Sequence, residues 1–412
     1  MKVRLTDRWI YIIAVINAIF LIIKYGVDIE FDTTSYIAAW DNSWSKGIID
    51  IFRTPIYPIF LGTLRSVFGN NFMLAVIIVQ HFVFLISIYY FKLSLSWNVN
   101  SHTVVQWITL VYALLPATST WANCILTESF AISGIVFLFY NLFSCLHNKK
   151  ISYTLWVTFW LFILLMLRPA FLYLIPALII AWLLLIKTNK RLAIIGIAGV
   201  CIVGCIEFGY CNLFKERYGI FTPSCVSIYN QQYLAFQDSL MVPTFTNNCG
   251  YQQYITEYNG KEIPASSSIN DYGLITVSNA IHISQQTYTL AWIKHAFMRF
   301  GYALTEPLLS AHGGSITLKN FFGLSINIAY IFIITYLIIL VYQILHHKKL
   351  RITSLILWIT VVGNLITVII GAQNSWGRLL LPSLPLFIIM FGQAFNYIKF
   401  NINGNTKETQ IE

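Results

Sequence analysis

Long apolar stretches separated by short charged or polar segments constrain this chain more than any other feature of its sequence. A helix of about 20 apolar residues can cross the hydrocarbon core of a bilayer, and such stretches recur from one end of the chain to the other. Hydrophobic residues make up 57% of the 412 residues and charged residues 10%, whereas soluble domains carry about 25% charged residues. The sequence therefore predicts an all-α polytopic membrane protein.

Ten windows are apolar and long enough to be transmembrane helices. Only Arg168 and Pro169 separate the fifth from the sixth, so these two form either a tight hairpin or one broken helix. A further stretch at 288–309 is interrupted by charged side chains and is either an interfacial helix or an additional span. The ten windows are 9–27, 71–92, 104–122, 128–147, 152–168, 171–187, 192–210, 320–345, 352–371 and 379–398.

Clusters of lysine and arginine set the expected orientation, because positively charged loops remain on the cytoplasmic side. Such clusters precede the first window and follow the even-numbered ones, for example at Lys149 and Lys150. Both termini are then cytoplasmic. The formal charge of +10 is accounted for by these clusters, so we expect a lipid bilayer and no nucleic acid as a partner. The segments expected outside are 28–70, 123–127, 168–170, 211–319 and 372–378.

This topology divides the chain into four parts. Residues 1–210 form a transmembrane module that includes the outer loop 28–70, and the polar segment 211–319 forms a small extracytoplasmic cap of short helices and loops. Residues 320–400 hold the C-terminal transmembrane helices. The polar tail 401–412 is expected to be disordered.

Seven cysteines are present without a C-x-x-C pair, and most of them fall in or beside apolar windows. We therefore expect no zinc site, since the spacing of metal ligands is absent. Cys225 and Cys249 lie in the long polar segment, where a disulfide is possible in an oxidising compartment. The sequence leaves open whether they are bonded.

The first outer loop holds candidate catalytic residues. Asp32 and Tyr36 are four residues apart, so on a helix they point the same way, and Trp40 continues that face. An ionised carboxylate close to an acceptor hydroxyl can serve as a general base. Spacing alone does not distinguish Asp32 from the other acids of the loop, which can equally well keep the loop in water. Those acids are Asp28, Glu30, Asp41 and Asp50.

The run Arg53-Thr54-Pro55-Ile56-Tyr57-Pro58 is typical of a helix start. Thr54 suits the N-cap and Pro55 the first turn. Arg53 would then stand just ahead of a helix N-terminus, where a guanidinium and free backbone N–H groups favour a phosphate. The alternatives are an arginine that binds lipid headgroups or one that only closes the loop.

Three more charged residues fall at outer helix ends. Glu128 opens the fourth window, where the helix dipole favours its ionised form and explains it without a function. Arg168 and Arg378 are each followed by proline, and both can extend toward headgroups. Facing one way at the membrane surface, they also suit a lipid-linked phosphate.

The order Asp32-x-x-x-Tyr36, Arg53-Thr54-Pro55-x-Tyr57-Pro58, Thr127-Glu128-Ser129, Arg168-Pro169 and Gly377-Arg378 with Pro382 and Pro385 resembles the GT-C superfamily of membrane glycosyltransferases. Within it, the chain is similar to bacterial members related to protein O-mannosyltransferases and aminoarabinose transferases. The resemblance covers the first 170 residues and about the last 40. Thr33 follows Asp32 where many relatives carry a second acid.

This resemblance implies metal-independent transfer of a sugar from a polyprenyl-phosphate donor to a glycan, lipid or protein acceptor, with no cofactor. By this likeness Asp32 is the catalytic base and Glu128 a second acid near the acceptor, while Arg53 and Arg378, with Arg168, hold the donor phosphate. Tyr36 and Tyr57 would position substrate. The expected location is the outer face of a bacterial inner membrane.

Two other functions are compatible with a polytopic chain of this kind. An O-antigen polymerase or ligase usually concentrates its functional residues in a large late loop, whereas here the acids and the Arg-Pro motif precede the second window. A transporter or flippase is expected to bury charges within its spans and to show internal symmetry. Glu207 is the main acid inside a window, and the sequence has no internal repeat.

Overall fold

The computed structural model describes residues 7–263, 267–306, 308–309, 311–312, 315–316, 334, 337–338, 341, 352–372 and 376–402. Within these residues the chain is helical, apart from one short antiparallel pair of two-residue strands, β1 (Leu308–Leu309) and β2 (Ser315–Ile316). The expected fold class, all-α, is therefore confirmed. Most of the window 320–345 lies outside the described residues, and its described residues 334, 337, 338 and 341 are helical. Of the tail 401–412, only residues 401 and 402 are described, and they end α20.

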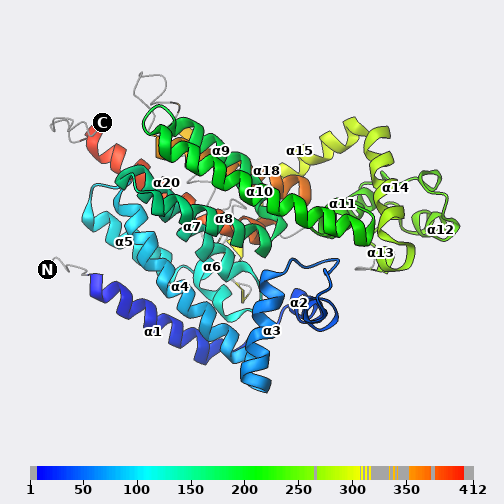
Figure 1. Ribbon diagram of the computed structural model, residues 1–412, viewed down its shortest axis with the longest axis horizontal. Helices are drawn as coiled ribbons and strands as arrows, with labels where there is room; N and C mark the ends of the chain where they lie inside the picture. The colour runs from blue at the N-terminus through cyan, green and yellow to red at the C-terminus, as the bar shows by residue number, and fades with distance from the viewer. Residues whose placement is uncertain are drawn as a thin grey trace.

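The first half of the chain forms the helical bundle (Figure 1). Its helices are α1 (Asp7–Tyr25), α2 (Phe31–Asn42), α3 (Ile56–Phe68), α4 (Phe72–Ser96), α5 (His102–Leu114), α6 (Pro116–Ser119), α7 (Glu128–Asn148), α8 (Ile151–Leu167), α9 (Leu174–Leu185) and α10 (Lys190–Tyr218).

The second half adds a helical cap and returns to the bundle. Its helices are α11 (Val226–Gln237), α12 (Cys249–Tyr258), α13 (Ser267–Tyr272), α14 (Leu274–Thr287), α15 (Thr289–Thr305), α18 (Ile352–Gly371), α19 (Trp376–Leu380) and α20 (Leu384–Ile402).

Six stretches of helix are long and apolar enough to cross a membrane, which indicates an integral membrane protein. The expected count of ten is not confirmed, because α5, α8 and the stretch Pro169–Leu185 are apolar but shorter. Arg168 has an extended backbone, as a residue before proline prefers, and it separates α8 from α9. The six stretches are Asp7–Tyr25, Ile56–Ser96, Glu128–Asn148, Lys190–Tyr218, Ile352–Gly371 and Trp376–Ala394.

The helix α7 lies at the centre of the bundle (Figure 1). It packs against α4 on one side and α8 on the other, and its apolar side chains, including Leu138, Phe139 and Phe143, are buried. Gly134 allows close approach, since a Cβ there would lie 2.8 Å from Leu164 of α8. This packing fixes the position of Glu128, the first residue of α7.

The segment 211–319 has its own apolar core, formed mainly by α11 to α14 around Phe236, Tyr251 and Ile255. The helix α10 joins it to the bundle, because Phe214 near its C-terminus belongs to this second core. The sequence leaves open whether Cys225 and Cys249 are bonded, and the structure has both as free thiols, Cys225 buried and Cys249 exposed. Most of the stretch at 288–309 is the helix α15, and Leu308 and Leu309 at its end form β1. The apolar side chains Leu290 and Phe297 of α15 are exposed.

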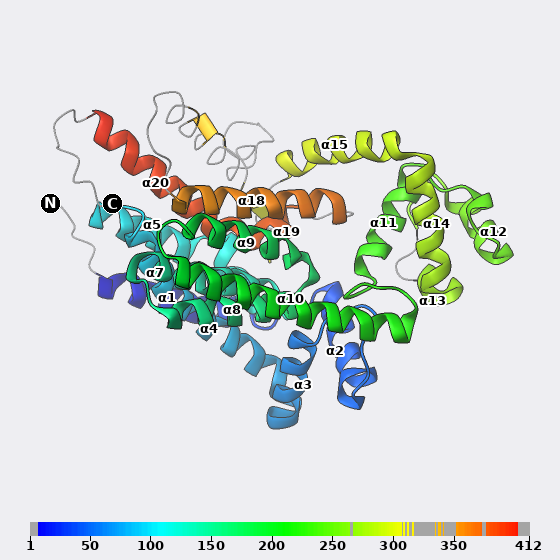
Figure 2. The same cartoon turned by 45° about the horizontal axis from the view of Figure 1, so that its top comes forward.

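The beginning of α1 and the end of α20 lie at the same end of the molecule, while α11 to α14 lie at the opposite end (Figures 1 and 2). The helices α2 and α3 are placed between these two ends, beside the bundle. They pack against each other and α3 continues into α4, so the first outer loop is attached directly to the bundle.

Candidate active site

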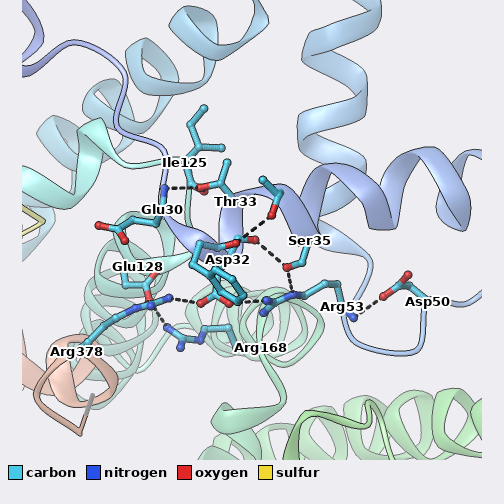
Figure 3. A network of polar contacts seen from close by, with 12 residues as sticks. Glu30, Asp32, Thr33, Ser35, Asp50, Arg53, Ile125, Glu128, Arg168 and Arg378 are labelled. Carbon is cyan, nitrogen blue, oxygen red and sulfur yellow. Dashed lines mark hydrogen bonds and ion pairs between the residues drawn. The ribbon is translucent and has the colours of Figure 1, made fainter. Parts of the chain in front are cut away.

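Charged side chains from five segments meet beside the bundle (Figure 3). Asp32 comes from the first turn of α2, and Arg53 lies in the loop just before α3. Glu128 begins α7, Arg168 follows α8, and Arg378 lies in α19. The structure therefore brings together all five charged residues that the sequence predicts for the site, although 346 positions separate Asp32 from Arg378.

Asp32 is held between two arginines. Its Oδ1 accepts a hydrogen bond of 2.7 Å from Nη2 of Arg53, and its Oδ2 accepts one of 2.8 Å from Nη2 of Arg378. Burial opposes ionisation of this carboxyl, but the two guanidinium groups outweigh it and lower the pKa of Asp32 below its ordinary value. The side chain is 30% exposed, so an ionised carboxylate remains accessible at the surface of the site.

Glu128 lies deeper and is fully buried. Its Oε1 accepts hydrogen bonds from Nε of Arg378 at 2.6 Å and from Nη1 of Arg168 at 3.3 Å. Within the described part of the chain, its Oε2 has no hydrogen-bond partner. As predicted, Glu128 occupies the first turn of α7, where the helix dipole favours a negative charge. Arg378 thus bridges the two carboxylates.

Arg53 is fixed by its neighbours in the first outer loop. Its Nε donates to Oγ of Ser35 at 2.8 Å, and its guanidinium lies 4.2 Å above the ring of Tyr36. Its backbone N–H donates to Oδ1 of Asp50 at 2.8 Å. The hydrogen bond to Ser35 and the ring of Tyr36 hold the guanidinium group, and the bond to Asp50 holds the backbone. The guanidinium is therefore oriented before any ligand binds.

The prediction that Thr54 is the N-cap of α3 is wrong. Pro55 occupies that position, and α3 begins at Ile56. The hydroxyl of Thr54 donates instead to the backbone carbonyl of Leu167, at 3.0 Å. This bond connects the start of α3 to the end of α8, beside Arg168, so Thr54 supports the site through a long-range contact.

The two tyrosines lie beneath the charged groups. The ring of Tyr36 is buried below Arg53 and meets the ring of Tyr57 edge-on, with the centroids 5.0 Å apart. Tyr57 is fully buried, and its hydroxyl donates to Gln80. We therefore expect Tyr57 to hold Tyr36 in place without touching substrate.

Several supporting residues are absent from the sequence-based prediction. Asp50 closes the turn before α3 by accepting from the backbone of Phe52 and Arg53, and an aspartate two to three residues ahead of its donors is a recognisable turn signal. Ser35 and Trp121, whose ring lies 5.9 Å from the Arg378 guanidinium, give no comparable signal. Their roles depend on contacts between distant segments.

Three guanidinium groups and two carboxylates form the described cluster, so these five side chains alone carry a formal charge of +1. All five side chains are partly or fully removed from water, with exposed fractions of 30% or less. Charge interactions are stronger in such an environment than in water. The arrangement therefore favours a singly charged anion beside an accessible carboxylate.

Comparison with known proteins assigns no family: no family model matches the chain, and no curated protein matches it.

Proposed function

We propose that the chain is a GT-C-type membrane glycosyltransferase that moves a sugar from a polyprenyl-phosphate donor to an acceptor on the extracytoplasmic face of a bacterial inner membrane. The observation that carries this proposal is the cluster of Arg53, Arg168 and Arg378 around Asp32 and Glu128. The formal charge of +1 on these five side chains matches the single negative charge of a phosphodiester-linked sugar. The order of the sequence motifs supports the same function.

Asp32 serves as the general base in this mechanism. It removes a proton from the acceptor hydroxyl as that oxygen attacks the anomeric carbon of the sugar. A bond forms between the acceptor oxygen and the anomeric carbon, and the bond from that carbon to the phosphate oxygen breaks. The electron pair remains on the phosphate, so the leaving polyprenyl phosphate gains a negative charge.

The arginines stabilise this developing charge. Guanidinium groups bind phosphate oxygens through charge-assisted and often bidentate hydrogen bonds, and fixed donors aimed at developing charge lower the barrier. Arg378 is the central contact, since it already bridges Asp32 and Glu128. When it turns toward the donor phosphate, Asp32 loses one of its two partners and becomes a stronger base.

The decisive experiment is transfer from labelled donors in membranes that contain the protein. Wild type and the variants Asp32→Asn and Arg378→Ala are incubated with a panel of polyprenyl-phosphate sugars and membrane acceptors, at matched protein levels. We expect transfer from at least one donor by the wild type. Loss of a general base typically lowers the rate by about 10²–10⁴-fold.

The exposed pair Asp41 and Arg65 provides matched controls on the same two helices, α2 and α3. Its members are 45% and 47% exposed and pair with each other away from the cluster, so Asp41→Asn and Arg65→Ala should retain wild-type transfer. Full transfer by Asp32→Asn would exclude the proposed base. Absence of transfer by the wild type from every donor would exclude the proposed activity.

A further inference from the structure

A second group of side chains lies next to the charged cluster and takes no part in the proposed reaction. Atoms of Asp28, Glu30 and Cys124 that can bind a metal all lie within 4.8 Å of one another. Figure 3 shows the carboxylate of Glu30 directed away from the pair of Asp32 and Arg53. These side chains therefore form a separate group with a mixed set of oxygen and sulfur donors.

His312, from a distant part of the chain, pairs with Asp28 of this group. Its Nδ1 lies 3.3 Å from Oδ2 of Asp28, and its ring stacks on Tyr25 with centroids 3.8 Å apart. The preceding residue, Ala311, is tied to Thr120 by a hydrogen bond from its backbone N–H. The stacking on Tyr25 orients the imidazole ring of His312, and the hydrogen bond of Ala311 holds the neighbouring backbone.

These contacts are unusual for a group that binds nothing. Cys124 is 0% exposed, and no hydrogen bond from its thiol is found within the described residues. In that same part of the chain, no lysine or arginine pairs with Asp28 or Glu30. Two close carboxylates repel each other unless a cation or proton lies between them. A buried thiol directed at such a pair indicates a soft divalent cation.

The spacing also suits a tetrahedral ion. Zinc binds oxygen and nitrogen at about 2.0–2.1 Å and thiolate sulfur at about 2.3 Å, so neighbouring ligand atoms lie about 3.3–3.6 Å apart. Ligand atoms of Asp28, Glu30 and Cys124 lie within 4.8 Å of one another, so small rotations of these side chains would bring them to this spacing. Carboxylate and thiolate are ligands that zinc accepts.

The backbone around this group is rigid. Asp28 pairs with the segment after Asn123, donating to its carbonyl at 3.0 Å and accepting from Ile125 at 3.1 Å. The hydroxyl of Thr33 links the N–H of Glu30 to the carbonyl of Ile125. The donors are therefore held by backbone contacts that do not depend on the ion, as a preformed metal site requires.

We propose that Asp28, Glu30 and Cys124 bind one zinc ion, with His312 holding the carboxylate of Asp28 in place. The ion joins the turn before α2 to the segment before α7, and these two elements carry Asp32 and Glu128. It contacts none of the reacting atoms, so the transfer step remains metal-independent. This proposal departs from the expectation of no zinc site, which rested on sequence spacing, because the three ligands come from two distant segments.

The metal content of the purified protein tests this proposal. The chain is expressed with zinc in the medium, purified in detergent through a tag without histidine and without chelators, and analysed by mass spectrometry for metals. We expect about one zinc per chain in the wild type and at least a fivefold loss in Cys124→Ser and Glu30→Gln. The matched control is Cys225→Ser, which alters another buried free thiol and should retain the ion.

Replacement of zinc by cobalt gives a second readout that needs no variant. Thiolate bound to cobalt produces a charge-transfer band in the near ultraviolet, and this band should appear when the metal-free wild type is titrated with Co²⁺. Wild type with less than a tenth of an equivalent of zinc and no cobalt band would overturn the proposal, since Asp28 and His312 then form only an ion pair. Full zinc content in both Cys124→Ser and Glu30→Gln would overturn it too, because the ion then lies elsewhere. Neither readout depends on glycosyl transfer.

Discussion

At the level of single residues, Arg378 is the centre of the site. It donates to Asp32 through Nη2 and to Glu128 through Nε, so one guanidinium couples the accessible carboxylate to the buried one. Of these two acids, Arg53 contacts Asp32 and Arg168 contacts Glu128. A ligand that engages Arg378 therefore changes the surroundings of both acids at once, whereas a ligand at Arg53 or Arg168 changes one.

This coupling predicts a specific pH dependence. Because Arg53 and Arg378 lower the pKa of Asp32, the carboxylate is ionised near neutral pH, and its ion pairs are lost only as the pH falls through that lowered pKa, below about 3.9. Replacing Arg378 by glutamine removes one cation and leaves the burial, so the pKa of Asp32 should rise. The acid limb of kcat/KM for transfer should then move to higher pH.

The measurement is the pH profile of kcat/KM for wild type, Arg378→Gln and Arg65→Gln. The last variant removes a surface arginine that pairs with Asp41, and its acid limb should coincide with that of the wild type. An unchanged acid limb in Arg378→Gln, alongside a lower rate, would mean that Asp32 is not the titrating base.

At the level of elements, the position of Asp32 depends on how α2 packs against α3. Asp32 and Tyr36 do share a face, as their spacing predicts, because Arg53 contacts both. The same face continues to Trp40, whose ring lies directly over Gly62 of α3. The close approach of α2 and α3 at Gly62 depends on how the ring of Trp40 fits against that glycine. The periodicity of the sequence carries no information about this fit.

We expect Gly62→Ala to disturb this contact. A Cβ at position 62 would lie 2.1 Å from the ring atoms Cδ2 and Cε2 of Trp40, so the ring or the helix must move. Overpacking of this kind costs about 1–3 kcal/mol. Thermal unfolding in detergent should show a lower midpoint, and transfer should fall because α2 carries Asp32.

The matched control is Gly209→Ala in α10, where an added Cβ meets no atom within 4 Å. Alanine in an unobstructed helical position is more stable than glycine by about 0.5–1 kcal/mol, so this variant should melt at or above the wild-type temperature. Equal melting temperatures for Gly62→Ala and the wild type would show that Trp40 is not packed as described.

At the level of the whole molecule, the sequence predicted the class of fold and the membership of the charged cluster better than it predicted the contacts. The length of an apolar window identified the central helix α7 to within a residue, and helix-end positions identified Glu128, Arg168 and Arg378. The bridge from Arg378 to both acids and the bond from Thr54 to Leu167 join segments far apart in the chain. Such pairings depend on how the helices pack. The local rules of capping do not include packing, so they predicted Thr54 as the N-cap of α3 and missed its bond to Leu167.

The native cysteines provide a test of the proposed orientation across the membrane. Cys249 is exposed in α12, within the cap, at the end of the molecule opposite to the start of α1 and the end of α20 (Figure 1). Cys201 and Cys205 are exposed as well, but they lie in an apolar stretch of α10 that is long enough to cross the membrane. In the proposed topology, only Cys249 faces water on the outer side.

A membrane-impermeant maleimide should therefore label the wild type in intact spheroplasts, and Cys249→Ser should remove at least nine-tenths of that label. Cys201 and Cys205 should remain unlabelled, because a polar reagent does not enter hydrocarbon and thiols there react poorly. Cys225→Ser is the control, since that thiol is buried and its loss should not change the label. Labelling of Cys249 only after the membrane is opened would place the cap in the cytoplasm. Because α2, α3 and the start of α7 are held against the same framework, the charged cluster would then face the cytoplasm as well, and transfer on the outer face would be excluded.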